Sequence, residues 1–173
     1  VSCRSFLDKK YPSEALSLIT NLITAGYLVL AQALLIDFRL LPLPEIKIAE
    51  KLIDMKTKAI LLVSPNNPTG VEYPKDLLLD FFKLAKKNQI MLILDETYRD
   101  FHSNQDPIHN LFNEKNWGNT LVSLYSFSKS YRLTGHRIGA LITKSKRLNQ
   151  IEKFLDSVTI CPNQLGQIGA LIG

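Results

Sequence analysis

Cysteine, glycine, proline and long apolar runs are all scarce in this sequence. Its 173 residues contain two cysteines, eight glycines, eight prolines and one tryptophan. Cys3 and Cys161 lie far apart and outside any CxxC or Cys/His spacing, so the sequence predicts neither a disulfide framework nor a zinc site. The low glycine and proline content, beside 46% hydrophobic residues, excludes a low-complexity chain and favours one globular domain with a sizeable core.

No apolar stretch reaches the length that a membrane-spanning helix requires. The longest candidate, residues 25–41, is interrupted by Gln32, Asp37 and Arg39. Residues 1–10 do not show the pattern of a signal peptide either. Because the cysteine usage also suits a reducing compartment, we expect a cytoplasmic protein with no membrane partner.

The formal charge of +5 arises from 21 lysines and arginines against 16 acidic residues. The basic residues are scattered along the chain among acidic ones, and they form neither a basic tract nor a basic helix face. Dispersed charge of this kind gives little support for nucleic-acid binding, so we expect no nucleic-acid partner.

Hydrophobic periodicity predicts alternating helices and strands. Helical spacing of apolar residues covers 13–24, 44–55, 73–88 and 145–157. Short apolar runs that suit buried strands cover 27–33, 59–63, 90–94, 121–125 and 138–143. Alternation of this kind predicts the α/β class, with a three-layer α/β/α architecture around a mostly parallel sheet.

Three polar segments follow predicted strands at their carboxyl ends. They are residues 64–70, 95–98 and 126–129. The carboxyl ends of parallel strands meet at one edge of the sheet, and open α/β sheets bind their ligands there. The sequence therefore predicts a ligand site formed by these three segments.

The chemistry of these segments, taken by itself, leaves alternatives open. Ser126, Lys129 and Arg137 place a hydroxyl, an amine and a guanidinium near one strand end, which suits a phosphate. A solvated surface loop fits the same residues. Asp95 after a buried strand requires a cationic or hydrogen-bonding partner; alternatively it caps a helix N-terminus or is solvated at the strand end. Residues 66–70 also have the composition of a plain turn.

Taken together, the three segments resemble motifs of the class I/II aminotransferases, a family of pyridoxal 5'-phosphate (PLP) enzymes of fold type I. The matching motifs are Asn-Pro-Thr-Gly at 67–70, Asp-Glu-Thr-Tyr at 95–98, and a third at 126–139. The third motif opens with Ser-Phe-Ser-Lys and closes with Gly-His-Arg-Ile-Gly. The motifs follow one another in the family's order and at similar separations, and the resemblance runs from Ser13 to the C-terminus.

The resemblance implies a role for each residue that contacts the cofactor ring. Lys129 would form the Schiff base with PLP and later move a proton between substrate and cofactor. Asp95 would pair with the pyridinium nitrogen, which keeps the ring an electron sink. Asn67 and Tyr98 would donate hydrogen bonds to the phenolic oxygen. The expected catalytic residues are thus Lys129, Asp95 and Tyr98.

The resemblance also implies residues that hold the cofactor phosphate. Ser126 and Arg137 are the main candidates, and Ser128 is a further one. Ser13 would contribute from the N-terminus of the first predicted helix, where free amides favour an anion.

Two positions depart from the family pattern. Tyr11 stands where the family usually has a glycine beside the phosphate, and Leu35 stands where an aromatic ring commonly stacks on PLP. These departures bear on how tightly the cofactor would bind.

The resemblance implies an aminotransferase of amino acid metabolism that moves an amino group from an amino acid to a 2-oxo acid, and a homodimer at full length. It also implies that residues 1–173 are a single PLP-binding large domain, truncated at both ends and without the small domain. Two alternatives remain open. One is another fold-type I reaction, of a β-lyase or a synthase, which would use the same Lys129 and Asp95. The other is a degenerate, non-catalytic PLP-binding or regulatory module.

Other residue types give weaker signals. His102, His109 and His136 share no metal-ligand spacing and are expected to be loop or surface residues. Phe112 and Trp117 lie in the long loop that follows residue 98, where they either line a substrate entrance or, as we expect, pack beneath the loop.

Overall fold

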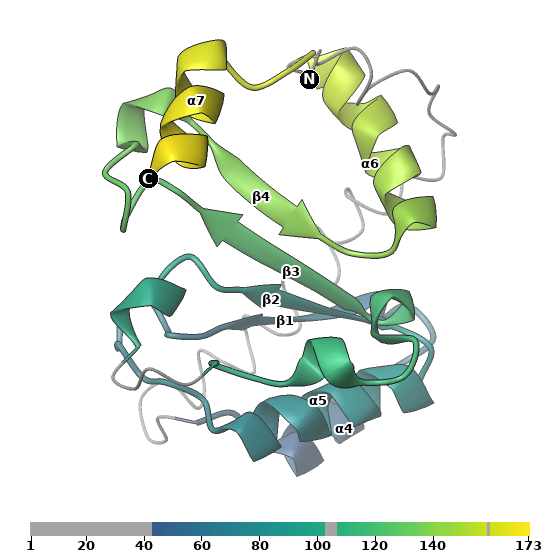
Figure 1. Ribbon diagram of the computed structural model, residues 1–173. Coiled ribbons are helices and arrows are strands. Elements are labelled where there is room, and N and C mark those ends of the chain that lie inside the picture. The colour runs from purple at the N-terminus through teal and green to yellow at the C-terminus, as the bar shows by residue number, and fades with distance from the viewer. Residues whose placement is uncertain (1–42, 103–106, 159) are drawn as a thin grey trace.

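The computed structural model describes residues 43–102, 107–158 and 160–173 of the chain. In this part of the chain the helices and strands are α4 (Ile46–Leu52), β1 (Ala59–Val63), α5 (Lys75–Lys87), β2 (Met91–Asp95), β3 (Leu121–Ser126), β4 (Gly139–Ile142), α6 (Ser145–Val158) and α7 (Gln164–Ile172) (Figure 1). Short 3₁₀ helices at Arg99–Phe101, Leu111–Asn113, Trp117–Asn119 and Thr134–His136 lie in the connections. None of the helices described is long and apolar enough to cross a membrane.

The strands form one sheet in the order β1-β2-β3-β4. The first three strands run parallel, and β4 pairs antiparallel with β3. The register places Val63, Asp95 and Leu124 side by side near the carboxyl ends of the parallel strands. The predicted α/β class with a mostly parallel sheet is therefore confirmed, and the three polar segments follow β1, β2 and β3 as expected.

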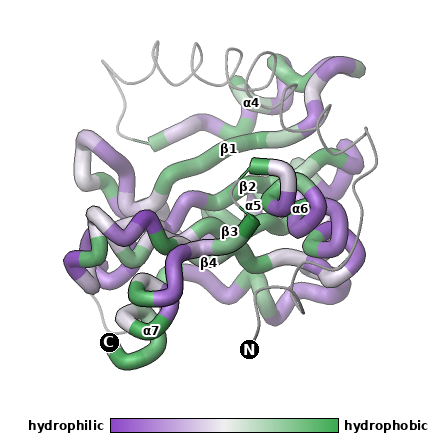
Figure 2. The backbone as a smooth tube through the Cα atoms, turned by 90° about the horizontal axis from the view of Figure 1, so that it is seen from above, coloured by the Kyte–Doolittle hydropathy of each residue, from purple (hydrophilic) through white to green (hydrophobic). Residues whose placement is uncertain are grey.

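The main hydrophobic core lies between the sheet and α5. Helical spacing gathers Leu78, Phe81, Phe82 and Ala85 on one face of α5, and each is at most 1% exposed. They pack with side chains of the parallel strands, Ile60, Leu62, Leu92 and Leu94. β1 consists of apolar residues throughout, as its colour in Figure 2 shows, which suits a strand covered on both faces.

A smaller apolar cluster occupies the other face of the sheet. Ala59, Met91 and Val122 are buried there, with Ile93 partly buried beside them. Successive side chains of a strand point to opposite faces, so Asp95 lies on the same face as Met91 and Ile93. Figure 1 shows α4 and α5 on one side of the sheet and α6 and α7 on the other.

The Arg147 side chain joins α6 to the segment that precedes β3. Its guanidinium donates to the carbonyl oxygens of Gly118 and Asn119, at 2.8 Å each, and to the hydroxyl of Thr143. One planar fork of donors thus holds the first turn of α6 against the entry to the sheet.

Several elements begin or end a few residues away from their predicted bounds. The helix predicted over 44–55 ends at Leu52, because Ile53 is extended and Asp54 starts a turn. The carboxylate of Asp54 accepts hydrogen bonds from the amides of Lys56 and Thr57, at 2.9 Å each. A side chain that satisfies nearby backbone donors in this way competes with helix continuation. The helix predicted over 13–24 and the strand predicted over 27–33 lie outside the described residues.

Candidate functional site

The three predicted polar segments meet at one edge of the sheet. Asn67 lies in the turn after β1, Asp95 is the last residue of β2, and Tyr98 stands in the turn that follows it. Lys129 lies three residues beyond the end of β3. Parallel pairing of these strands brings residues together that are far apart in the sequence.

The side chain of Tyr98 is the point where the segments come into contact. The amide nitrogen Nδ2 of Asn67 lies 3.4 Å from the Tyr98 hydroxyl oxygen and donates to it. The ammonium nitrogen Nζ of Lys129 lies 5.6 Å from the centre of the Tyr98 ring, which is cation–π distance. Tyr98 is half-buried, whereas Asn67 and Lys129 are exposed. An amide, a phenol and an amine therefore share one accessible place.

Asp95 presents its carboxylate at the end of β2. The side chain is half-buried, and its Oδ1 accepts a hydrogen bond of 2.9 Å from the amide of Thr97. This bond closes a local turn directly after the strand, which fixes the carboxylate relative to the Tyr98 segment. Asp95 and Tyr98 thus lie at the same strand end, on either side of a hydrogen-bonded turn.

The turn after β1 is held by Asn66. Its carbonyl oxygen accepts from the amide of Gly70 at 2.7 Å, and its side-chain oxygen accepts from the hydroxyl of Thr69 at 2.7 Å. Gly70 has a φ of +72°, a left-handed conformation that glycine adopts without strain. The turn that the composition of residues 66–70 suggests is therefore the same turn that places Asn67 against Tyr98.

Ser126 and Ser128 lie together at the end of β3. The amide of Ser128 donates to the Ser126 hydroxyl oxygen at 3.2 Å, and the Thr134 hydroxyl donates to the Ser128 carbonyl oxygen at 2.8 Å. Ser128 is buried and Ser126 is half-buried. The two hydroxyls and the amide form a polar strand end next to Lys129.

Arg137 lies on the same loop as these serines but does not contact them. It has a left-handed φ of 51°, and its guanidinium donates to the carbonyl oxygen of Thr134 at 3.1 Å. Among the described residues, no hydrogen bond joins Arg137 to Ser126 or Ser128. Ser13, the remaining phosphate candidate, lies outside the described residues, as do Tyr11 and Leu35.

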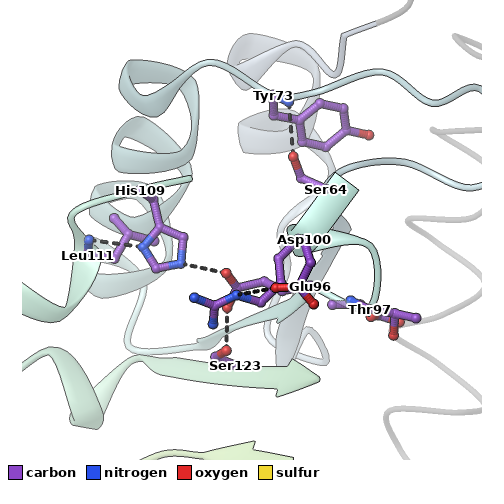
Figure 3. A network of polar contacts seen from close by, with 10 residues as sticks. Ser64, Tyr73, Glu96, Thr97, Asp100, His109, Leu111 and Ser123 are labelled. Atoms are coloured by element: carbon purple, nitrogen blue, oxygen red, sulfur yellow. Dashed lines mark hydrogen bonds and ion pairs between the residues drawn. The ribbon is translucent and has the colours of Figure 1, made fainter. Parts of the chain in front are cut away.

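A buried polar cluster behind the site was missed by the sequence analysis. Glu96, His109 and Ser123 are 2%, 6% and 1% exposed, and Figure 3 shows their side chains pointing toward one another. His109 lies in a loop, as one of the two expected alternatives has it, but it is buried rather than exposed. The sequence offered one signal of this burial. Glu96 directly follows Asp95, and successive side chains at a strand end point to opposite faces of the sheet.

The aromatic residues of the long loop pack as expected. Phe112 and Trp117 both lie against the main core, and their rings meet edge to face with centroids 4.9 Å apart. Packing beneath the loop, rather than lining an entrance, accounts for both side chains.

A second cluster of aromatic residues surrounds Tyr125, near the end of β3. Its hydroxyl donates to the Asp100 carboxylate, and the guanidinium carbon of Arg99 lies 5.7 Å from its ring centre. Burial raises the pKa of Tyr125, and the hydrogen bond to Asp100 and the charge of that carboxylate raise it further, to about 12. Tyr125 therefore stays a neutral hydrogen-bond donor at physiological pH.

Comparison with known proteins assigns the chain to a family. The family model for aminotransferase class I and II matches residues 43–171. An aspartate aminotransferase from Thermotoga maritima is 37% identical over 128 residues, which are 74% of this chain and 34% of that protein. A glutamate-pyruvate aminotransferase from Haemophilus influenzae is 34% identical over 116 residues, 64% of this chain and 28% of that one. The protein belongs to the class I and II aminotransferase family.

The fold agrees with solved structures of that family. A crystal structure of the aspartate aminotransferase from Thermotoga maritima superposes with a TM-score of 0.64 at 34% identity, covering 74% of this chain and 34% of that one. The chain thus spans about a third of the length of the relatives that it matches.

Proposed function

We propose that the protein acts as a PLP-dependent aminotransferase, which transfers an amino group between an amino acid and a 2-oxo acid. The observation that carries this proposal is the gathering of Lys129, Tyr98 and Asn67 at the edge where β2 ends in Asp95. We further propose that residues 1–173 belong to a single PLP-binding large domain.

The chemistry of the residues present fits PLP. The cofactor has a carbonyl that requires an amine, a ring nitrogen that requires a carboxylate, a phenolic oxygen that requires donors and a phosphate that requires hydroxyls and amides. Lys129, Asp95, the Asn67–Tyr98 pair and the Ser126–Ser128 strand end offer these groups in one place. Bound PLP would supply an electron-withdrawing ring, which stabilises negative charge on the substrate carbon.

The residues around the ring have distinct tasks in this proposal. Lys129 Nζ provides the amine that attaches the cofactor and, once released, accepts and returns the proton of the substrate carbon. Asp95 keeps the ring nitrogen protonated by pairing with it. Asn67 and Tyr98, already hydrogen-bonded to each other, turn their donors toward the phenolic oxygen.

The phosphate is held by a second group of residues. Ser126 and Ser128 offer hydroxyls and an amide, and Arg137 offers a guanidinium after its side chain leaves the Thr134 carbonyl. Ser13, in the preceding part of the chain, completes the proposed phosphate contacts. We propose that this anchor keeps the cofactor in place while its amine partner changes.

The names of the relatives support the substrate classes. Aspartate aminotransferase and glutamate-pyruvate aminotransferase are both named for amino acids, and pyruvate is a 2-oxo acid. We propose amino acids and 2-oxo acids as the substrates, and a cytoplasmic homodimer by analogy with the family.

The first test is a covalent label. The purified chain is mixed with PLP, reduced with borohydride, digested and mapped by peptide mass spectrometry. We expect label on Lys129, no label in Lys129→Ala, and unchanged labelling of Lys129 in Lys146→Ala, which removes another exposed lysine. Label spread evenly over surface lysines would contradict the proposed site.

The second test measures the reaction of the protein after it is mixed with PLP and without borohydride reduction, since reduction would fix the cofactor to the lysine permanently. The protein is incubated with aspartate or glutamate as amino donor, and the consumption of an added 2-oxo acid is measured. A transaminase consumes one 2-oxo acid for each amine transferred. A separate incubation with cysteine, which carries a leaving group on its β carbon, would identify a lyase instead if it released pyruvate, ammonia and sulfide with no 2-oxo acid consumed.

A further inference from the structure

A carboxylate is buried directly behind the proposed cofactor site. Glu96 follows Asp95 in the chain, but its side chain is 2% exposed and points away from the face that carries Asp95. The hydroxyl of Ser123 on β3 donates to Oε2 of Glu96, and Nε2 of His109 lies 3.3 Å from Oε1 (Figure 3). A side chain from β3 and one from the long loop therefore meet at this carboxylate.

The hydrogen bonds determine which nitrogen of His109 carries the proton. The amide of Leu111 donates to Nδ1 of His109 at 3.2 Å, so Nδ1 must present a lone pair. In the neutral ring the proton then resides on Nε2, which faces Glu96. His109 thus directs Nε2 toward Oε1 of Glu96 across 3.3 Å, while Oε2 of Glu96 accepts a hydrogen bond from Ser123.

The same contacts keep Glu96 ionised. Burial by itself raises the pKa of Glu96, but the hydrogen bonds from His109 and Ser123 outweigh burial and hold the pKa below the ordinary value for glutamate. The guanidinium of Arg99 acts in the same direction. A buried, charged carboxylate held by Ser123 and facing His109 resists movement, because a shift would take its charge away from both groups.

The backbone of Glu96 links this cluster to the proposed site. Its amide donates to the Leu124 carbonyl oxygen at 2.8 Å, and its own carbonyl oxygen accepts from the amide of Arg99 at 2.9 Å. The first bond extends the pairing of β2 with β3, and the second closes the turn that contains Tyr98. The side chain and the main chain of Glu96 therefore fix the same short segment, residues 95–99, to β3.

We propose that Glu96, held by Ser123 and His109, is a positioning residue that sets the placement of Asp95 and Tyr98 against the cofactor. This inference rests on the proposed function, because it concerns how that site is held. The reason to expect such a role is the chemical type of the residue. An apolar side chain would fill the same buried space without the free-energy cost of desolvating a charge. The carboxylate instead forms directional interactions, which fix the orientation of the segment in a way that apolar packing does not.

The proposal is tested first without cofactor, by amide hydrogen exchange and mass spectrometry of the full chain. In Glu96→Gln one acceptor oxygen faces two donors, and in Ser123→Ala one donor is lost. We expect peptides covering 95–99 to exchange on the order of tenfold faster in both variants, since hydrogen bonds to charged groups contribute strongly. Ser123→Thr keeps the hydroxyl and should restore slow exchange.

Ser64→Ala is the matched control for Ser123→Ala. Ser64 is 0% exposed, follows the neighbouring strand β1 and accepts from the amide of Tyr73 at 2.9 Å (Figure 3). Its loss should speed exchange in peptides covering 64–73 and leave 95–99 unchanged. If Ser64→Ala and Ser123→Ala increased the exchange rate of peptides 95–99 equally, the cluster would contribute only to general stability. That result would overturn the proposal.

The second readout is cofactor binding. We expect the Kd of PLP to rise about tenfold in Glu96→Gln and in Ser123→Ala, and the pH midpoint of the visible absorption band to shift. Neither quantity should change in Ser64→Ala or Ser123→Thr. An unchanged Kd and midpoint in Glu96→Gln, with Lys129 still labelled, would overturn the positioning role alone. Absence of the Lys129 label in the unaltered chain would overturn the proposed function and this role together.

Discussion

The parallel part of the sheet and the elements that follow it differ in how fully they are packed. β1, α5, β2 and β3 enclose side chains with almost no exposure, such as Phe81, Phe82 and Leu92. In contrast, α6 has no buried side chain among its described residues, and the only buried residue of α7 is Gly166. Leu165 and Leu171 of α7 are 72% and 86% exposed.

This difference bears on how the candidate site is built. Asp95, Tyr98 and Ser126 extend from the well-packed parallel strands, where each strand end is fixed by neighbours on both sides. Arg137 precedes the antiparallel edge strand β4, and its guanidinium donates a hydrogen bond within its own loop, to the carbonyl oxygen of Thr134. Asp95, Tyr98 and Ser126 are therefore better fixed than Arg137, the arginine proposed to contact the phosphate.

The largest expected effect comes from emptying the core beneath α5. Phe81 is 0% exposed, so Phe81→Ala should lower the free energy of unfolding by about 3–5 kcal/mol through lost burial and a residual cavity. Ile151→Ala, at a half-buried position of α6, should lower it by about 1 kcal/mol or less. Urea unfolding followed by circular dichroism measures both. Similar losses would mean that α6 contributes to a core as much as α5 does.

A smaller effect is expected where the two parts join. A Cβ on Gly139 would lie 2.8 Å from the Tyr125 carbonyl oxygen, which belongs to the backbone of β3 and cannot turn aside. Gly139→Ala should therefore separate β4 from β3 and lower the free energy of unfolding by about 1–3 kcal/mol.

Gly135→Ala provides the matched comparison for Gly139→Ala. A Cβ on Gly135 would meet nothing within 4 Å, so the change should stay within about 0.5 kcal/mol. The same urea titration measures both variants. If Gly139→Ala proved as mild as Gly135→Ala, the pairing of β4 with β3 would contribute little to stability.

The smallest effect on the free energy of unfolding is expected in alkaline solution, where Tyr125 loses its proton. Its pKa is raised from 10 to about 12, so the folded state favours the protonated phenol. The associated stability is fully present below pH 10 and is lost as the pH rises to about 12. The loss should be small, because the side chain is only partly buried and solvent screens it.

Tyr125→Phe isolates this alkaline effect. The variant should show a flatter dependence of unfolding free energy on pH between 10 and 12. The tyrosinate absorbance titration should lose the component with a midpoint near 12. Loss of a component with the ordinary midpoint near 10 instead would mean that the hydrogen bond from Tyr125 to Asp100 does not persist in solution.

Much of the fold followed from local sequence patterns. The strand predicted over 59–63 has those bounds in the structure, and the helix predicted over 73–88 appears as Lys75–Lys87. Apolar runs and helical spacing report burial directly, which makes such elements predictable. The early end of α4 was not predicted, because it depends on side-chain hydrogen bonds of Asp54 that no periodicity reveals.

The candidate site, too, was predictable from the sequence only in part. The residue types and order of the three motifs came from the sequence, whereas the contacts of Tyr98 with Asn67 and Lys129 required strand pairing to be known. The loop position of His109 followed from the sequence, but its burial did not, because the Glu96 carboxylate that it faces lies on another element. A histidine in a polar loop carries no local sign of burial.

By itself, the sequence determined the class of fold, the strands that form the parallel sheet and the motifs at their carboxyl ends. These features depend on burial patterns and residue types that neighbouring positions display. Only the tertiary structure decided which side chains meet across strands, that β4 runs antiparallel, and that Glu96 is bonded behind Asp95. Such contacts depend on register and on the pairing of distant segments, which a single sequence does not encode locally.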